Sequence, residues 1–338
     1  MNNAVDAVIT WVNGEDKEWL CKRSQYDSCV RDNEGKNPAR YRDWDTLKYV
    51  IRSIEKNLSW IRHIYLVTDH QLPTWYQPGG KVIVVDHKEY IPHEYLPTFS
   101  SHTIENNIYR IHGISDQFIY FNDDTIILHP MKKEDFFLHG KVRDCASLHI
   151  HCVKKSLMIY QISNNDISLI NEHFNIAEVL RKNKSGWFNI KYGLKRNLKT
   201  IILSNSPRFP GIEQFHMPQA YLKRTFETVW QKEYDVLDET CRHKFRHKND
   251  VNQWLFRDWQ LANGDFVPVA PKHRGILIDF EKNDEKDELK KCLTIIRGNS
   301  HQMICINDGD TIQDVETIRT SVISALEEKF PEKAACEK

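Results

Sequence analysis

No stretch of this 338-residue sequence approaches the roughly 20 consecutive apolar residues that a transmembrane helix needs. The first residues, MNNAVDAVITWV, contain no basic segment followed by a long apolar one, so the pattern of a secretory signal peptide is missing as well. These two absences favour a cytoplasmic protein over one that spans a membrane.

The sequence also lacks an excess of charge of either sign. Lys and Arg total 47 and Asp and Glu total 47, which gives a formal net charge of zero. Proteins that bind nucleic acid through bulk charge are basic overall, so that class is not expected here, although a local basic surface remains compatible.

None of the eight cysteines forms a CxxC pair. Reduced thiols are the expectation for a chain of this size without an export signal. Cys145, His149, His151 and Cys152 are ligand types that suit zinc, but their spacing matches no zinc arrangement. A strand that carries His and Cys is the preferred interpretation.

The sequence does contain short β-rich runs that alternate with amphipathic helices. The runs at 5–12, 64–68, 82–85 and 118–121 predict strands. One helix is predicted after Asp43 as N-cap and another from Ser101. This alternation predicts an α/β fold with a mostly parallel sheet and helices on both faces.

Polar residues follow each predicted strand, at Asn13-Gly14, Asp69, Asp86-His87 and Asn122-Asp123-Asp124. The carboxyl ends of parallel strands meet at one edge of a sheet, where ligands bind. Two adjacent carboxylates are costly there without a cation, and Mg2+ prefers carboxylates together with phosphate oxygens. Asp123 and Asp124 therefore predict a phosphate-containing substrate, and the alternative is a solvated turn.

The second half of the chain offers basic residues and a histidine. Lys191, Lys195, Arg196 and Lys199 lie in the stretch 186–200, which suits either an anionic acceptor, a membrane surface or a solvated basic face. His216 precedes Pro218, which predicts the first turn of a helix and a His at its start. A capping or packing role is the alternative for His216.

Three more features are predicted towards the end of the chain. Arg246 lies in the run CRHKFRHKND and offers a donor fork that suits phosphate, unless the run is only a solvated charge cluster. A helix is expected to begin near Asn249. The last helix is expected from about 311 to 330 with Asp310 as N-cap, followed by a loose tail.

Four segments taken together resemble the Stealth family, which contains capsular-polysaccharide phosphotransferases of bacteria and the related GlcNAc-1-phosphotransferase of animals. They are DAVITWVNGED at 6–16, the long block at 40–124, FPGIEQFHMP at 209–218 through FRHKND, and CINDG at 305–309. Asn13 departs from the family pattern, where many members have Asp, and Trp44 and Thr46 replace an expected Asn and Glu.

The resemblance implies a Rossmann-like core that binds a nucleotide sugar, with inserted helical elements. Residues 1–130 would form the N-terminal part of the catalytic core and 211–330 its C-terminal part. Residues 131–210 would form an inserted, acceptor-side region, and 331–338 a loose tail.

The implied reaction transfers a sugar-1-phosphate from a nucleotide sugar, expected to be a UDP-sugar, to a hydroxyl of a growing capsular polysaccharide. It would release a nucleoside monophosphate, use Mg2+ or Mn2+, and act on a lipid-linked acceptor at the inner membrane face. Two alternatives stay open at this stage: a metal-dependent glycosyltransferase that releases a nucleoside diphosphate, and a non-catalytic polysaccharide-binding protein.

The resemblance also implies roles for individual residues. His216, Arg246 and Asp123 are expected to be catalytic, with His216 as the base. Metal ligands are expected among Asp123, Asp124, Asn307 and Asp308. Donor contacts are expected from Trp11, Asn13, Gly14, Arg42, Arg52, Asp69 and His102.

Overall fold

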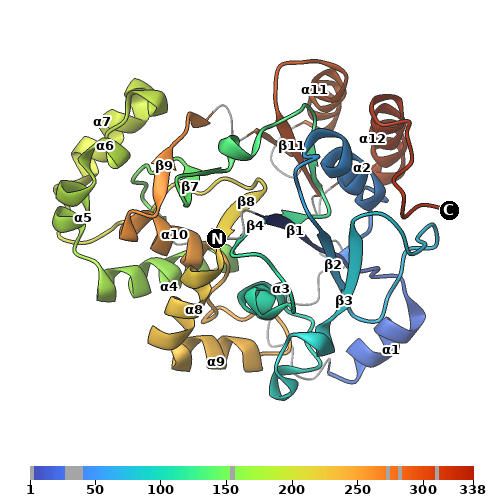
Figure 1. Ribbon diagram of the computed structural model, residues 1–338, viewed down its shortest axis with the longest axis horizontal. Coiled ribbons are helices and arrows are strands. Elements are labelled where there is room, and N and C mark those ends of the chain that lie inside the picture. The colour runs from blue at the N-terminus through green and yellow to red at the C-terminus, as the bar shows by residue number, and fades with distance from the viewer. Residues whose placement is uncertain (1–3, 27–40, 153–156, 272–274, 281–283, 309–311) are drawn as a thin grey trace.

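The computed structural model describes residues 4–26, 41–152, 157–271, 275–280, 284–308 and 312–338. Its main sheet has the strand order β3-β2-β1-β4-β8 (Figure 1). The strands are β1 (Val5–Thr10), β2 (Ile64–Thr68), β3 (Val82–Asp86), β4 (Gln117–Asn122) and β8 (Gln219–Leu222). The first four are parallel and β8 is antiparallel to β4, which confirms the predicted, mostly parallel sheet.

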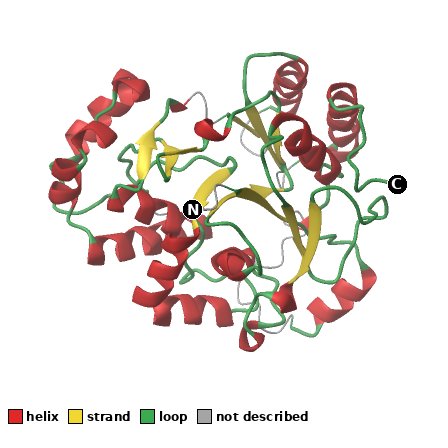
Figure 2. Ribbon diagram, in the orientation of Figure 1, coloured by secondary structure: helices red, strands yellow, loops and turns green. Residues whose placement is uncertain are grey.

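Helices cover both faces of this sheet, as the sequence predicts (Figure 2). In the view of Figure 1, α2 (Leu47–Asn57) lies above the sheet, while α3 (Ser101–Asn107) and α8 (Lys223–Lys232) lie below it. Further helices are α1 (Lys17–Ser24), α4 (Met158–His173), α5 (Ile176–Lys182), α6 (Lys184–Trp187), α7 (Gly193–Leu203), α9 (Tyr234–Arg242) and α10 (Trp254–Asn263).

Two small sheets flank the main one. The first has the order β10-β11-β5 and consists of β10 (Ile276–Asp279), β11 (Met303–Asn307) and β5 (Thr125–Ile127). The helices α11 (Glu285–Arg297) and α12 (Val315–Lys329) pack against each other beside it. The second consists of β6 (Phe137–Leu138), β7 (Lys141–Asp144) and β9 (Phe266–Pro268).

The structure corrects the expectation of a helix at Pro218. The residues after Pro218 form β8, and helix α8 begins only at Lys223. All four residues of β8 are buried, because they pair with the open edge of β4. His216 therefore precedes a strand and not a helix.

Other helix boundaries also differ from their predictions. Helix α2 begins after Thr46 and not after Asp43, whose carboxylate accepts a hydrogen bond from Trp11 instead. Helix α10 begins at Trp254, five residues later than Asn249 suggests. In the last helix Asp314 is the N-cap, and the predicted cap Asp310 lies outside the described residues.

The tail at 331–338 is packed and not loose. Glu337 accepts hydrogen bonds from Nε and Nη2 of Arg52 at 2.7 and 2.6 Å, and Ala334 and Cys336 are buried. The tail is ordered because it neutralises an arginine that α2 buries.

The inserted region shares the core of the rest of the chain. Residues of α4 and α6, such as Ile170 and Trp187, belong to the same buried cluster as the main sheet. No helix among the described residues has the length and apolar character needed to cross a membrane. The described cysteines are free: Cys21, Cys145, Cys152, Cys241, Cys292, Cys305 and Cys336.

Candidate active site

The candidate site lies at the carboxyl edge of the main sheet, where β4 ends. Asp123 and Asp124 form the turn that joins β4 to β5. Because β8 runs antiparallel to β4, with Gln219 opposite Tyr120, the residues before Gln219 reach the same edge. His216 consequently lies beside Asn122, with 3.3 Å between His216 Nε2 and Asn122 Nδ2.

Three carboxyl groups at this edge have raised pKa values. Burial, then the neighbouring Asp124 and Asp43, hold the pKa of Asp123 well above its usual range. Burial also raises the pKa of Asp124, although His216 and Cys305 offset part of this effect. Burial raises the pKa of Asp43 in the same way. The edge thus favours whatever neutralises negative charge, whether a proton or a cation.

The contacts of Asp124 leave room for such a cation. Its Oδ2 accepts a hydrogen bond from the Cys305 thiol at 3.4 Å, whereas its Oδ1 is buried without a hydrogen-bond partner. Ligand atoms of Asp124, His216 and Cys305 all lie within 4.8 Å of one another. An orphaned carboxylate oxygen beside further carboxylates fits a hard divalent cation.

The thiol of Cys305 is a hydrogen-bond donor and a poor ligand for such a cation. Burial and the nearby Asp124 raise the pKa of Cys305 well above its usual range, so the group stays protonated. Thiols are also soft ligands, while Mg2+ prefers oxygen. Cys305 is therefore best described as the group that orients Asp124.

The ends of β10 and β11 add more oxygen atoms to the edge. Backbone N–H of Ile306 donates to the carbonyl of Asp124 at 3.1 Å, which fixes β11 beside the acidic turn. Asn307 Nδ2 donates to Asp279 Oδ1 at 3.5 Å. Arg42 Nη1 lies 3.0 and 2.9 Å from the two carboxylate oxygens of Asp308, so these two predicted site residues form an ion pair.

The loop before α2 holds the acidic turn from the other side. Thr46 Oγ1 donates to the carbonyl oxygen of Asp123 at 2.7 Å. Trp11 Nε1 donates to Asp43 Oδ2 at 2.9 Å, so Trp11 reaches the site by positioning a carboxylate. The loop thereby contributes Thr46, which supports the turn, and Asp43, which is the third carboxyl group of the site.

A second group of side chains surrounds Asp250, in the segment that contains Arg246. His102 Nδ1 lies 2.8 Å from one carboxylate oxygen of Asp250, and His243 Nδ1 lies 2.6 Å from the other. Burial acts against ionisation, but these two contacts hold the pKa of Asp250 below its usual value. Arg246 donates to Ser101 Oγ at 2.7 and 3.1 Å, at the start of α3.

His243, His247 and Asp250 also bring ligand atoms within 4.8 Å of one another. Their fit to a cation is weaker than at Asp124, because both oxygens of Asp250 already accept hydrogen bonds. In the described part of the chain, neither candidate metal group includes Cys145, His149, His151 or Cys152.

The residues after β1 and β2 lie at the same edge with partners of their own. Asn13 exchanges two hydrogen bonds of 2.9 Å with the Gln71 side chain. A Cβ atom on Gly14 would lie 2.2 Å from the carbonyl oxygen of Tyr41, so only glycine fits there. Asp69 is paired with Lys22, whose Nζ lies 2.7 Å from each carboxylate oxygen.

Arg52 is not brought to this edge by its contacts. Its guanidinium donates to Glu337, to Glu327 and to the carbonyl oxygen of Phe330. These partners all belong to α12 and the tail, which gives Arg52 a structural role. The predicted donor contact of Arg52 receives no support from its surroundings.

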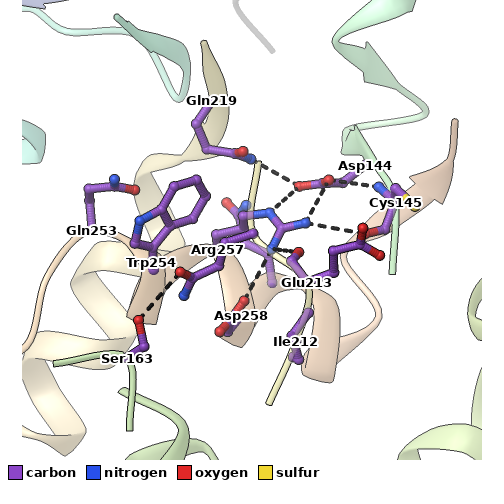
Figure 3. Close-up of polar contacts among 12 residues, drawn as sticks. Asp144, Cys145, Ser163, Ile212, Glu213, Gln219, Gln253, Trp254, Arg257 and Asp258 are labelled. Atoms are coloured by element: carbon purple, nitrogen blue, oxygen red, sulfur yellow. Dashed lines mark hydrogen bonds and ion pairs between the residues drawn. The ribbon is translucent and has the colours of Figure 1, made fainter. Parts of the chain in front are cut away.

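A buried ion-pair network around Arg257 contacts the segment that carries His216 at Glu213 and Gln219 (Figure 3). Arg257 Nε and Nη2 donate to the Asp144 carboxylate at 2.9 and 3.0 Å, and Nη1 donates to the backbone oxygen of Glu213 at 3.0 Å. Gln219 Nε2 donates to Asp144 Oδ2 at 3.0 Å. The network therefore fixes the chain on both sides of His216.

Sequence reasoning missed four residues of this site: Asp43 as a member of the acidic group, Asn122 as the partner of His216, Asp279 and Cys305. Asp279 ends the apolar run ILID, just as Asp123 follows the run FIYFN. The same pattern of an acid at the end of a strand could therefore have predicted Asp279. Asn122 and Cys305 lie in segments that the sequence singled out, but their partners His216 and Asp124 could not be predicted, because these contacts depend on strands that pair across the fold.

Comparison with known proteins identifies the relationship. Two family models match: Stealth protein CR1, conserved region 1, over residues 4–28, and Stealth protein CR2, conserved region 2, over residues 40–145. The receptor polysaccharide phosphotransferase WefC of Streptococcus gordonii is 35% identical over 340 residues, which cover 100% of each chain. This chain belongs to the Stealth family.

Other relatives of this Stealth chain also align along nearly its whole length. The capsular polysaccharide phosphotransferase WcwK of Streptococcus pneumoniae is 35% identical, with 99% of this chain and 98% of that protein covered. The exopolysaccharide phosphotransferase cps2G of Lactiplantibacillus plantarum is 36% identical, with 99% and 96% covered. The chain is accordingly an enzyme, a transferase.

Solved structures are more distant. The glycosyltransferase GlyE of Streptococcus pneumoniae TIGR4 is 12% identical with a TM-score of 0.37, and the alignment covers 99% of this Stealth chain and 66% of that chain. A likeness this low carries no argument about the reaction.

Proposed function

We propose that this Stealth chain transfers a sugar-1-phosphate from a nucleotide sugar to a hydroxyl of a cell-surface polysaccharide. The products are a phosphodiester and a nucleoside monophosphate. One observation carries the proposal: His216 adjoins a half-buried, uncompensated carboxylate turn in a chain whose full-length relatives are named polysaccharide phosphotransferases.

In this reaction the acceptor oxygen bonds to the phosphorus that carries the sugar, and the bond from that phosphorus to the nucleoside phosphate breaks. The acceptor proton passes to His216 Nε2. Asn122 Nδ2 lies 3.3 Å from His216 Nε2, so the Asn122 side chain helps to hold the imidazole in place beside the acidic turn. Asn122 is thus a positioning residue for the base.

The acidic turn is the proposed place for the metal. Asp123 and Asp124 would hold Mg2+ or Mn2+, with Asn307 from the neighbouring strand end as a further oxygen donor. Asp308 would join them by exchanging its ion pair with Arg42 for the ion. When bound, such an ion neutralises charge on the donor phosphates and on the leaving monophosphate. Arg246 supplies a guanidinium for the same charge and is held by Ser101.

The donor is proposed to be a UDP-sugar that contacts Trp11, Asn13, Gly14, Arg42, Asp69 and His102. The acceptor is proposed to be a lipid-linked polysaccharide, bound on the side of residues 131–210, and the site of action to be the inner face of the cytoplasmic membrane. The order of strands supports the donor part, because Trp11, Asn13 and Gly14 follow β1 and Asp69 follows β2 at the edge where parallel sheets bind ligands.

Product analysis tests the reaction. The protein is incubated with Mg2+, a panel of nucleotide sugars and a capsular glycan. Release of nucleoside monophosphate with a phosphodiester signal in the phosphorus NMR spectrum is the expected result. Nucleoside diphosphate would place the attack at the anomeric carbon and replace this proposal by glycosyl transfer.

Substitution of the base tests its role. His216→Ala should lower turnover by about 10²- to 10⁴-fold without a change in the free energy of unfolding, because the His216 side chain is exposed. His112→Ala, which removes an exposed histidine elsewhere, is the control. Turnover within a few-fold of wild type for His216→Ala would remove it from the role of base.

A further inference from the structure

Helix α7 packs against the protein with its polar side. Thr200 is its one buried residue among those described, and its Oγ1 accepts a hydrogen bond from Leu148 N at 3.2 Å. Arg196 donates to the Glu213 carboxylate through Nε at 3.1 and 2.9 Å and through Nη2 at 2.9 Å, and Lys199 Nζ lies 2.9 Å from His149 Nδ1. A surface helix of a globular protein normally packs its apolar side against the core and exposes its polar side, and α7 does the opposite.

The opposite side of α7 is apolar and faces solvent. Leu194, Leu198, Ile201 and Ile202 have helical spacing along one face, and their exposed fractions are 84, 53, 52 and 63%. Ile190, just before the helix, is 94% exposed. Figure 1 shows α7 at the periphery of the molecule, far from the main sheet. Contiguous exposed aliphatic residues of this kind mark an interaction surface.

The surroundings of this face are strongly basic. The segment 179–212 contains no Asp or Glu, although the whole chain has equal numbers of acidic and basic residues. Its basic residues are Arg181, Lys182, Lys184, Lys191, Lys195, Arg196, Lys199 and Arg208. Lys191 and Lys195 are exposed next to the apolar face. The partner of this surface must therefore be apolar and negatively charged.

We propose that α7 docks onto an anionic lipid bilayer, with its axis parallel to the membrane plane. An amphipathic helix with Lys on its flank and Leu and Ile on one face binds the headgroup region in this way. The two aliphatic termini of the face, Ile190 and Ile202, would enter the bilayer, while Lys191 and Lys195 would contact lipid phosphates. A second copy of the chain is a poorer partner, because two such basic surfaces repel each other.

Vesicle sedimentation tests this surface with the full chain. Vesicles of phosphatidylcholine with phosphatidylglycerol should bind the protein, and vesicles of phosphatidylcholine alone should bind it at least tenfold more weakly. The double variant Leu194→Glu, Ile202→Glu should lose binding at least tenfold. Leu72→Glu, which changes an apolar residue that is 56% exposed in the loop after β2, should bind like wild type.

A second variant keeps the test independent of the apolar substitutions. Lys191→Gln and Lys195→Gln should each weaken binding by about fivefold at low salt, since a basic residue near an anionic surface contributes about 1 kcal/mol. No binding of the wild type to anionic vesicles would overturn the proposal. So would unchanged binding of the variants, or a dimer in light scattering that the double variant abolishes.

The proposal is separable from the proposed chemistry. Its residues lie outside the carboxyl edge of the sheet, where the donor is proposed to bind, so the affinity for a UDP-sugar with Mg2+ should be equal for wild type and for the double variant. Loss of vesicle binding with intact donor binding would support the docking surface by itself. Loss of donor binding in the same variant would show that the substitutions disturb the fold beyond α7 and would overturn the assignment of the lost vesicle binding to this face.

Discussion

Asp144 and Asp258 lie around the guanidinium of Arg257, whereas Asp43, Asp123 and Asp124 lie around one another. In the first group one guanidinium faces two carboxyl groups. Burial raises the pKa of Asp258 to about 7, so its carboxyl group is partly protonated near neutral pH. Among the described residues, no arginine or lysine side chain forms an ion pair with Asp43, Asp123 or Asp124. Buried charges that are compensated within the chain serve the fold, and those that are not require something from outside.

The largest expected effect comes from removing the cation of the compensated group. Arg257→Met leaves Asp144 buried without its partner and should lower the free energy of unfolding by about 3–5 kcal/mol, measured by urea denaturation. Adding Asp144→Leu to this variant should restore much of the loss. An unchanged urea midpoint for Arg257→Met would contradict the structural role of the pair.

Removing an acid from the uncompensated group should lower activity and leave stability intact. Asp124→Asn should lower turnover on the order of 10³-fold, because it removes a proposed metal ligand, while stability without metal stays equal or rises. Turnover and urea denaturation are measured on the same preparation. Asp116→Asn, which changes an exposed carboxylate, is the control. Destabilisation of Asp124→Asn to the level of Arg257→Met would end the distinction between the two groups.

Metal binding gives a smaller and more direct measure. Mg2+ at 100 times its dissociation constant should stabilise the wild type by about 2.7 kcal/mol and raise its melting temperature by several degrees. Asp124→Asn should show no such rise, whereas Arg257→Met should keep it. A rise of equal size in both variants would show that the ion binds elsewhere.

The smallest effect is a dependence on pH. A carboxyl group whose pKa is higher in the folded than in the unfolded chain destabilises the fold as pH rises from its ordinary value, about 3.9, through its raised value. Asp124→Asn should therefore gain stability relative to wild type between pH 4 and pH 8 without metal. Saturating Mg2+ should cancel this gain. A wild type that becomes relatively more stable as pH rises would contradict the raised pKa of Asp124.

Much of the main sheet was predictable, because its strands are short apolar runs that end in polar residues. Residues 64–68 form β2 as predicted. Strand β3 is one residue longer than predicted at its carboxyl end, and β4 is one residue longer at both ends. Strand β8 was not predictable in this way. Its four residues follow a proline and adopt the extended conformation only because β4 offers an edge.

The residues of the candidate site also divide into those that a local sequence pattern predicts and those that depend on contacts between distant segments. Asp123 and Asp124 could be found from the sequence, since the acids directly follow a buried strand. The placement of His216 beside Asn122 could not, because it depends on an antiparallel pairing between segments almost a hundred residues apart. The tail was misjudged for a related reason: Glu337 is ordered by Arg52, and no local pattern connects the two.

The pairing of β4 with β8 has a consequence for insertions and deletions. Moving β8 by one position along β4 would shift His216 by about 3.4 Å and exchange the sides on which Gln219 and Tyr221 point. Gln219 is held by Asp144, and Tyr221 donates its hydroxyl proton to the backbone oxygen of Gln253 at 2.9 Å. The number of residues between His216 and Gln219 should consequently tolerate less change over evolution than their identity.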